Sequence, residues 1–296
     1  MNNKQSRRDF LFRSGQLIAS AGLLTKRGPS LWSRPRPPLA EPNVITRALG
    51  KTGLTVPVVS LGFMNADNPG LIRRAYEVGI RHFDTAAAYQ RGRNEEMVGS
   101  MIQEMGVRSS VIVSTKVWLR DQVRDPKARD LFRQTFEGSL KRLRMDHVDI
   151  LYYHLVDSLE DLRAEGPLQA LAELKKEGKA RSIGFSTHQG GLVLPEAAKS
   201  GSFDVALVAF NLTMASDQVL LEALDNAARA GLGIVAMKTQ AGGLSRPDPK
   251  LPKNLPPCSQ TALLKWALQH PSVATAIPGA TTYEQVDQNF AVASNL

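Results

Sequence analysis

Cysteine is almost absent, because Cys258 is the only one among 296 residues. A single thiol excludes an intramolecular disulfide and a four-cysteine metal or iron–sulfur site. The composition is otherwise that of a globular protein, with 43% hydrophobic and 22% charged residues. A chain of this length can bury a large core as one α/β barrel, which commonly takes about 250 residues, or as two smaller domains.

Two phosphate-binding motifs are also missing. Gly50-Lys51-Thr52 resembles the end of a phosphate loop, but Ile45 stands where that loop needs its first glycine. No Gly-x-Gly-x-x-Gly opens the first helical segment, which argues against an open, doubly wound nucleotide-binding sheet. That sheet is therefore the second choice of fold.

Acidic residues are scarce at the start of the chain. Residues 1–40 contain eight basic residues and one acid, Asp9, and they carry most of the formal net charge of +9. The remainder of the chain is nearly neutral and shows no basic footprint for nucleic acid. We expect no nucleic-acid partner.

This basic segment has the order of an export signal. Arg7-Arg8 precede Phe10-Leu11, and a short, mildly apolar run follows at 16–24. The pattern resembles a twin-arginine signal, and the run is too short to span a bilayer. We expect residues 1–40 to form this signal and a Pro/Arg-rich linker. Residues 41–296 would form the domain that the twin-arginine machinery exports, already folded, to the periplasm.

The fate of the signal is open. No Ala-x-Ala cleavage motif is present, and prolines crowd the region before Ala40. Removal near Ala40 and retention as a membrane tether are both compatible with the sequence. The alternative interpretation of the whole segment is a disordered basic tail.

From residue 45 onward the chain alternates between strand-like and helix-like segments. Two short extended pieces at 45–56 flank a Gly-Lys-Thr-Gly turn, which predicts a β-hairpin. Short, continuously apolar runs follow at 58–62, 81–84, 111–115, 148–153, 182–186, 205–209, 233–238 and 274–278. Helical periodicity separates them, for example at 70–79, 94–105, 128–143, 167–177, 217–230 and 260–269. Eight such units favour a (β/α)₈ TIM barrel with an N-terminal β-hairpin.

Four chemically active side chains stand at or just beyond three successive predicted strand ends: Asp84, Tyr89, Lys116 and His154. In a barrel the carboxyl ends of the strands meet on one rim, where active sites lie. Asp84 can serve as the counter-ion that a buried Lys116 needs. A cation beside a phenol favours the phenolate, so Lys116 should make Tyr89 a better proton donor. His154 can donate a hydrogen bond to a carbonyl oxygen or share the proton transfer. The group protonates an oxygen but supplies no electrons, so a hydride donor such as a nicotinamide is needed.

Several segments carry a family resemblance. Residues 47–56 (Arg-Ala-Leu-Gly-Lys-Thr-Gly-Leu-Thr-Val) resemble the opening hairpin of the aldo-keto reductases, and residues 82–89 (His-Phe-Asp-Thr-Ala-Ala-Ala-Tyr) resemble their signature. Residues 94–99 continue that signature, and residues 114–118 and 153–154 match the remaining active-site segments. The chain from about Ile45 to Asn289 therefore resembles an aldo-keto reductase.

The resemblance implies a monomeric barrel that uses NADP(H) or NAD(H) to interconvert a small-molecule carbonyl and an alcohol. It also implies that Tyr89 is the general acid, that Lys116 and Asp84 tune it, and that His154 orients the carbonyl. It implies a cofactor shell made of Gly62, Phe63, Ser186, Thr187, Met237, Lys238, Gly279, Gln285 and Asn289. No metal is implied.

This shell departs from the family pattern. Thr187, Leu207 and Met237 replace the asparagine, glutamine and aromatic residue that the family commonly places around the nicotinamide. Gly279 and Gln285 stand where NADPH-specific relatives have basic residues, so the preference between NADPH and NADH is open. The departures and the export signal suggest a divergent bacterial branch.

Other assignments keep their alternatives. Trp118 and Phe63 would form apolar walls for the substrate, or pack in the core. The loop 239–259 follows the seventh predicted barrel strand and is either a functional lid or a disordered excursion. A nicotinamide-binding redox sensor with little turnover is the alternative function. A lyase that forms a Schiff base on Lys116 or Lys238 is the third possibility.

Overall fold

The computed structural model describes residues 43–240 and 259–296. The predicted export signal and linker, Cys258, and most of the predicted rim loop lie outside the described residues. No helix in the described part is long and apolar enough to cross a membrane.

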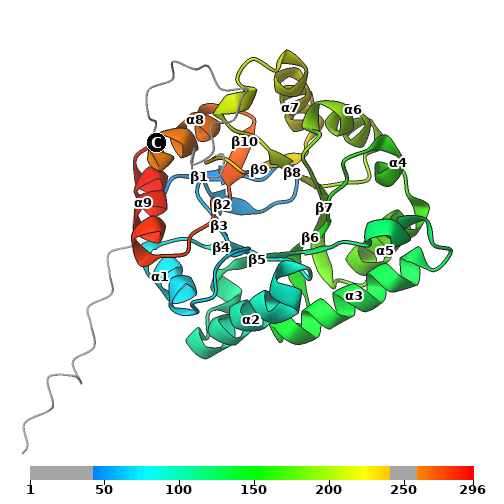
Figure 1. Cartoon of the computed structure of the whole chain (residues 1–296), viewed down its shortest axis with the longest axis horizontal. Coiled ribbons are helices and arrows are strands. Elements are labelled where there is room, and N and C mark those ends of the chain that lie inside the picture. Colours follow the sequence, from blue (N-terminus) through cyan, green and yellow to red (C-terminus); the bar gives the residue numbers. More distant parts are fainter. Residues whose placement is uncertain (1–42, 241–258) are drawn as a thin grey trace, which may run out of the picture. The chain divides into compact units, whose positions relative to one another are not determined.

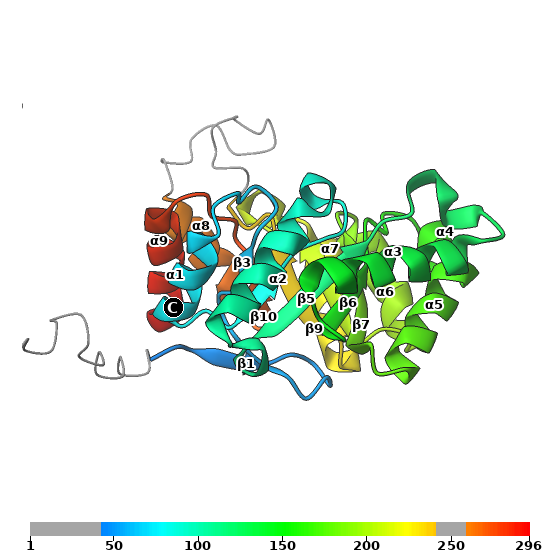
Figure 2. The same cartoon turned by 90° about the horizontal axis from the view of Figure 1, so that it is seen from below.

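The described chain opens with the predicted hairpin. Strand β1 (Thr46–Ala48) pairs antiparallel with β2 (Thr55–Pro57), and Gly50 in the turn adopts a φ of +53°. A side chain at Gly50 would meet the backbone nitrogen of Gly233 at 2.3 Å, so only glycine allows the turn to approach the barrel this closely. The hairpin lies along one end of the barrel (Figure 2, blue ribbon).

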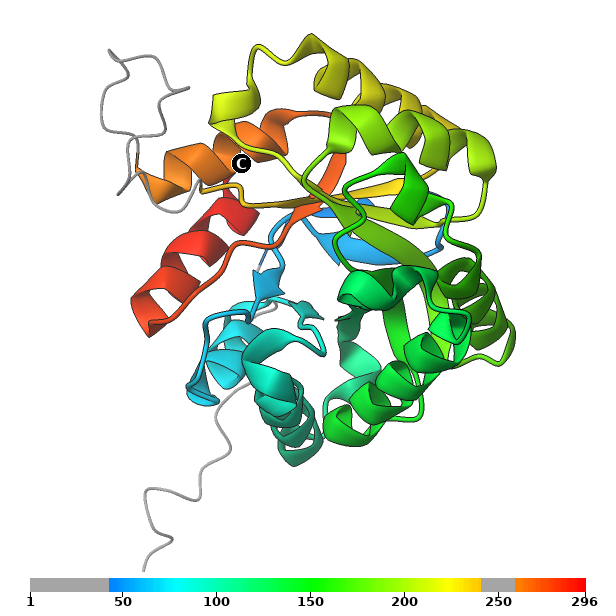
Figure 3. The same ribbon diagram turned by 45° about the vertical axis from the view of Figure 1, so that its right-hand side comes forward.

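All eight predicted barrel strands are present. They are β3 (Leu61–Gly62), β4 (His82–Asp84), β5 (Ile112–Val117), β6 (Val148–Tyr153), β7 (Ala180–Thr187), β8 (Val205–Ala209), β9 (Gly233–Met237) and β10 (Val273–Ala276). Each is parallel to its sequence neighbour. Parallel bridges between Val59 and Ala276 and between Gly62 and Gly279 join the first and last strands. The predicted (β/α)₈ barrel with an N-terminal hairpin is therefore confirmed (Figures 1 and 3).

Helices surround this ring of strands (Figure 1). They are α1 (Gly70–Val78), α2 (Arg93–Met105), α3 (Ala128–Leu143), α4 (Leu159–Leu162), α5 (Glu165–Lys176), α6 (Gly190–Ser200), α7 (Gln218–Ala230), α8 (Gln260–Gln269) and α9 (Tyr283–Ser294). The six helices named from periodicity match α1, α2, α3, α5, α7 and α8 to within two residues at each end. Helix α6 gave a weaker signal because it begins with two glycines and contains Pro195.

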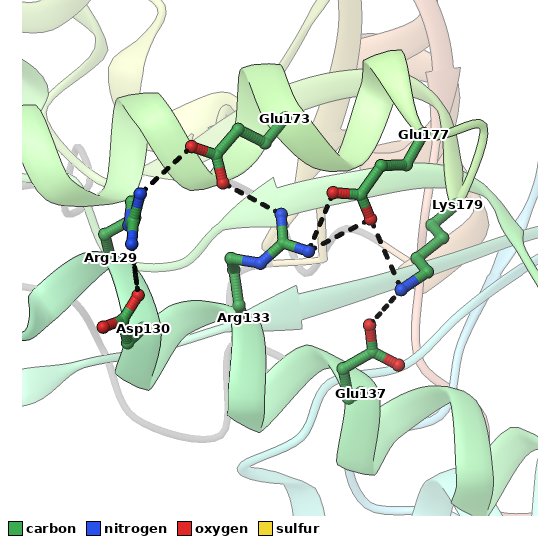
Figure 4. Close-up of polar contacts among 7 residues, drawn as sticks. All are labelled: Arg129, Asp130, Arg133, Glu137, Glu173, Glu177 and Lys179. Carbon is green, nitrogen blue, oxygen red and sulfur yellow. Dashed lines mark hydrogen bonds and ion pairs between the residues drawn. The ribbon is translucent and has the colours of Figure 1, made fainter.

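A network of ion pairs joins α3, α5 and the start of β7 on the outer surface (Figure 4). Arg133 contacts Glu173 at 2.9 Å and Glu177 at 2.8 Å, and Lys179 links Glu177 to Glu137. These side chains are partly exposed, and exposed pairs contribute only about 0–1 kcal/mol each. The network therefore connects two neighbouring helices but contributes little to stability.

The interior of the barrel is divided by polarity. An apolar cluster fills the side toward β6–β10 with residues that include Ile150, Leu207 and Val235. The side toward β3–β5 is polar, with His82, Ser114 and Lys116 almost fully buried. Side chains alternate between the two faces of a strand, which places His82 and Asp84, and likewise Ser114 and Lys116, on the inward face. The candidate site is built on this polar side.

Candidate active site

Asp84 and Lys116 form a buried ion pair at the ends of two adjacent strands. Asp84 ends β4 and Lys116 is the penultimate residue of β5, and their side chains are 2% and 1% exposed. The Lys116 ammonium contacts Asp84 Oδ2 and donates to the Thr85 carbonyl oxygen at 2.7 Å. Such a pair is stable only when its remaining hydrogen-bonding capacity is also satisfied.

The third donor of the ammonium is directed at Tyr89. Lys116 Nζ lies 3.3 Å from the phenol oxygen and 4.8 Å from the centre of the ring. Ala86 to Ala88 allow a tight turn, in which the Ala87 amide donates to the Lys116 carbonyl and the Tyr89 amide donates to the Ala86 carbonyl, both at 3.0 Å. Tyr89 then begins a short 3₁₀ turn, Tyr89–Gly92. The small residues thus bring the phenol over the lysine.

Lys116 keeps its proton in this setting. Burial alone would lower its pKa, but the Asp84 carboxylate and Tyr89 outweigh that effect and raise it. A protonated lysine cannot act as an amine nucleophile. The geometry therefore disfavours the Schiff-base possibility at Lys116.

His154 follows β6 and lies beside Tyr89. Its amide donates to the Val117 carbonyl at 2.9 Å, and its ring centre is 5.9 Å from that of Tyr89 at an interplanar angle of 80°. Burial, followed by the charges of Lys116, His188 and Lys238, lowers the pKa of His154 to about 3. The imidazole is therefore neutral near pH 7. Of the two predicted roles, this neutrality favours hydrogen bonding over proton transfer.

Trp118 also lies beside His154. Its ring centre is 6.3 Å from the His154 ring, Arg120 packs over it at 4.6 Å, and the residue is 37% exposed. A half-exposed indole next to the imidazole can form the predicted apolar wall. Phe63 is fully buried, and its ring centre lies 5.7 Å from that of Phe83 in an edge-to-face arrangement. For Phe63 this packing favours the core alternative over the substrate and cofactor assignments.

A cavity of about 580 Å³ opens between Tyr89 and α9. It is within the range of ligand-binding pockets, about 300–1,000 Å³. Asp84 and Tyr89 line it together with six residues of the predicted cofactor shell, Gly62, Met237, Lys238, Gly279, Gln285 and Asn289. Residues from three separate parts of the sequence therefore meet at one cavity beside the proposed acid.

Ser186 and Thr187 are not among the residues that line this cavity. Both are fully buried. Ser186 Oγ accepts from the Leu155 amide at 2.9 Å, and Thr187 Oγ1 donates to Asp157 at 3.1 Å. Their hydroxyl groups stabilise the loop after β6 in this structure, instead of pointing into the cavity.

Several lining residues were missed from the sequence. Met64 and Asn65 follow β3, and Thr239 and Gln240 follow β9. The rule that barrel sites gather at the carboxyl ends of strands could have identified them. Gln260 and Gln288 lie on helices and had no such signal.

The residues that line the cavity suit a large polar ligand. Thr239 Oγ1 is buried at its wall without a hydrogen-bond partner among the described residues, and a buried hydroxyl without a partner is costly. An added side chain at Gly279 would meet only the Gly62 carbonyl, at 3.9 Å, so the backbone there is open to a ligand. Within the described ranges, no group of three or more His, Cys, Asp or Glu residues could hold a metal ion.

Comparison with known proteins identifies the family of this chain. L-galactose dehydrogenase of Arabidopsis thaliana is 29% identical over 289 residues, covering 84% of this chain and 88% of its own. Methylglyoxal reductase DkgB of Salmonella typhi is 29% identical over 246 residues, covering 80% and 87%. An aldo-keto reductase from Klebsiella pneumoniae, solved in complex with NADPH, has the same fold with a TM-score of 0.64, 23% identity and coverage of 87% and 91%. Residues 63–262 match the sequence pattern of the aldo/keto reductase family, and the chain belongs to that family.

Proposed function

We propose that Tyr89 is the general acid of this enzyme and that the cavity beside it binds the nicotinamide cofactor. As a member of its family, the protein is an NAD(P)H-dependent oxidoreductase that interconverts carbonyl compounds and alcohols. The observation that carries the residue assignment is the position of Tyr89. Its phenol lies 3.3 Å from the buried Lys116 ammonium and also lines the cavity.

The cavity residues fit the cofactor by their chemistry. Thr239 offers a buried hydroxyl without a partner, while Lys238 and Gln285 add a cation and an amide at the wall. Gly62 and Gly279 leave room for the ligand to approach the backbone. When bound there, NAD(P)H supplies the hydride that reduces the carbonyl carbon. The Klebsiella relative was solved in complex with NADPH, which supports a nicotinamide dinucleotide as the ligand.

The chain's own residues supply the proton. As the carbonyl carbon gains the hydride and its electron pair, the oxygen becomes negative and takes the proton from Tyr89. The phenolate that remains is stabilised by the Lys116 ammonium, and Asp84 keeps that ammonium charged and in place. The phenolate then takes up one proton from the bulk solvent, so each reduction consumes one proton from solution.

His154 and Trp118 position the substrate. A neutral imidazole carries one N–H, and it can donate that hydrogen to the carbonyl oxygen without competing for its proton. The indole of Trp118, whose ring centre lies 6.3 Å from that of His154 and which is 37% exposed, forms an apolar wall for the substrate. His154 therefore orients the carbonyl, whereas Tyr89, next to the charged Lys116, gives up the proton.

The test is a titration of the full chain with NADPH and with NADH, followed by nicotinamide fluorescence and then by turnover of a panel of aldehydes and ketones. We expect saturable binding of at least one dinucleotide and oxidation of the reduced cofactor only when a carbonyl is added. Absence of binding would contradict the proposal. Binding without turnover across the whole panel would favour the redox sensor instead.

Export is a second proposal, which rests on the sequence alone. The paired Arg7-Arg8 followed by an apolar run supports a twin-arginine signal in residues 1–40 that delivers a folded domain, residues 41–296, to the periplasm of a bacterium. The signal and the altered cofactor shell support assignment to a divergent branch of the family, and export in the folded state would allow the cofactor to be loaded in the cytoplasm. Replacing both arginines with lysine should retain the protein in the cytoplasm, whereas unchanged localisation would contradict the signal.

A further inference from the structure

A buried histidine lies deeper in the barrel than the residues described so far. His82 is two residues before Asp84 on β4, is fully buried, and has hydrogen-bond partners on both ring nitrogens. Its Nδ1 lies 3.0 Å from Ser60 Oγ, and its Nε2 lies 3.0 Å from Ser114 Oγ. Nothing in the proposed proton transfer uses it.

The contacts of His82 belong to a continuous chain of side chains that ends at the active site. Thr275 Oγ1 lies 2.8 Å from Ser60 Oγ, and Ser60 contacts His82. His82 contacts Ser114, whose hydroxyl donates to Asp84 Oδ1 at 2.7 Å. The other oxygen of Asp84 holds Lys116. Four neighbouring segments of the barrel each contribute a member: β10, the residues just before β3, β4 and β5. The first two of these segments meet at the seam, where the first and last strands close the barrel.

The donors and acceptors along this chain follow from its last member. The Asp84 carboxylate can only accept, so the single hydroxyl hydrogen of Ser114 is used there. Ser114 must then accept from His82, which puts the imidazole hydrogen on Nε2. His82 Nδ1 must accept from Ser60, whose own oxygen is left to accept from Thr275. Every hydrogen in the chain therefore points toward Asp84.

We propose that His82 and Ser114 are positioning residues of the active site, which hold Asp84 and, through it, keep the Lys116 ammonium charged beside the phenol of Tyr89. This inference rests on the proposed role of Tyr89 as the acid. Hydrogen bonds to a carboxylate stabilise its charged form, and a buried chain of aligned donors is stronger than its separate bonds in water. His82 itself transfers no proton.

The charge state of His82 agrees with this role. Burial lowers the pKa of His82 to about 4, although Asp84 and Asp149 oppose that effect. The ring is therefore neutral near pH 7, with one donor and one acceptor, as the chain requires. The other titratable groups coupled by charge to a member of this chain are Tyr89 in the 3₁₀ turn, Tyr152 and Asp149 on β6, and His154 just after β6. Tyr152 stays protonated because burial, and then the Asp84 charge, raise its pKa.

The test compares Ser114→Ala, His82→Leu, His82→Gln and the double variant of Ser114→Ala with His82→Leu, all in the full chain. Ser182→Ala is the matched control, because Ser182 is a buried serine on β7 whose strand neighbour is the interior residue Ile150. The readouts are cofactor affinity by fluorescence, and kcat and KM for carbonyl reduction as functions of pH.

We expect Ser114→Ala to lower kcat about tenfold with unchanged cofactor affinity. A loosely held Asp84 raises the pKa of Lys116 less, so the ammonium loses its proton at lower pH. The alkaline limb of the kcat profile should therefore move down by about 0.5–1 pH unit. His82→Leu should do the same, whereas His82→Gln should recover most of kcat because an amide offers both a donor and an acceptor. Ser182→Ala should match the wild type.

The double variant shows whether His82 and Ser114 act through one series of hydrogen bonds or affect kcat independently. Because His82 acts only through Ser114, the double variant should be no worse than Ser114→Ala alone. Additive losses, or a wild-type kcat and alkaline limb in Ser114→Ala, would overturn the proposal. If His82→Leu does not fold, ¹⁵N NMR of labelled histidine in the wild type decides, with His82→Gln identifying the signal. Hydrogen on Nδ1 in place of Nε2 also overturns it.

Failure of the proposed function has a different signature. In that case the wild type binds no dinucleotide, or Tyr89→Phe keeps normal turnover. Failure of the present inference leaves both of those results intact and changes only the Ser114 and His82 variants.

Discussion

The ammonium of Lys116 lies between two groups of opposite function, with the Asp84 carboxylate on one side and the Tyr89 phenol 3.3 Å away on the other. The carboxylate keeps the ammonium protonated, and the ammonium in turn stabilises a phenolate. Asp84 therefore acts on the phenol at the cavity only through the lysine that it holds in place.

Tyr89→Phe removes only the proton donor. We expect kcat for carbonyl reduction to fall by about 10²–10⁴-fold, the usual contribution of a positioned general acid. The ring remains, so the dissociation constant of the cofactor should change little. Single-turnover kinetics and fluorescence titration of the same preparation measure the two quantities. Near-normal turnover in the variant would show that another group protonates the substrate.

Asp84→Ala leaves the Lys116 charge buried without its partner. Breaking a buried pair in this way costs about 3–5 kcal/mol, so the free energy of unfolding in urea should fall by that amount. The matched control is the double variant Asp84→Ala/Lys116→Met, in which no charge remains to be buried. Recovery of a large part of the lost stability is expected there. A double variant that is less stable than Asp84→Ala would contradict the pairing.

Acid should destabilise the fold through its buried histidines. The pKa of His82 is lowered by burial from 6.5 to about 4. The folded protein disfavours the charged imidazolium. The contribution of neutral His82 to the free energy of unfolding is therefore fully present above about pH 6.5 and is lost as the pH falls toward 4. The loss from this residue amounts to about 3 kcal/mol. His154, with a pKa of about 3, adds a similar loss that extends to lower pH.

The measurement is chemical denaturation between pH 7.5 and pH 4. His82→Gln has no imidazole to protonate, so its stability should depend less steeply on pH over the interval from about 6.5 to 4. Identical slopes in the variant and the wild type would mean that His82 is not buried in its neutral form.

Gly279→Ala should separate cofactor binding from folding. The added methyl group meets only the Gly62 carbonyl, at 3.9 Å, so stability should change by less than about 0.5 kcal/mol. The same methyl enters the lining of the cavity, and we expect about tenfold weaker cofactor binding. Unchanged cofactor affinity would show that the cofactor does not bind next to Gly279.

Gly99→Ala is the opposite control for that experiment. Its methyl group would lie 2.2 Å from the Leu143 carbonyl at the packing of α2 on α3, so it should destabilise the fold by about 1–3 kcal/mol. Cofactor affinity at a temperature where the variant remains folded should match the wild type.

The sequence predicted the barrel well because its strands are buried on both faces. Continuous apolar runs such as 205–209 are typical of strands buried on both faces, and the turn at Gly50 identified the hairpin. The four rim residues were also predictable, since they are the polar exceptions at strand ends. What distinguishes them is a local break in an apolar pattern.

Other features depend on contacts that no local pattern records. The hydroxyl groups of Ser186 and Thr187 form hydrogen bonds with the loop after β6. The ring of Phe63 packs in the core against Phe83. Whether a rim side chain faces the cavity or its neighbours is decided by three-dimensional packing. His82 shows the same limit, because its two serine partners lie 22 and 32 residues away.

The two bridges at the seam have a consequence for the order of events during synthesis. Gly62 and Gly279 pair across the join, and both line the cavity, although more than two hundred residues separate them. The ring can close only after the ribosome has released the last strand. A ligand that touches both glycines recognises the closed ring alone, so by mass action it opposes reopening. Cofactor binding should therefore slow amide hydrogen exchange at Gly62, whose N–H donates to the Pro278 carbonyl across the seam at 3.0 Å.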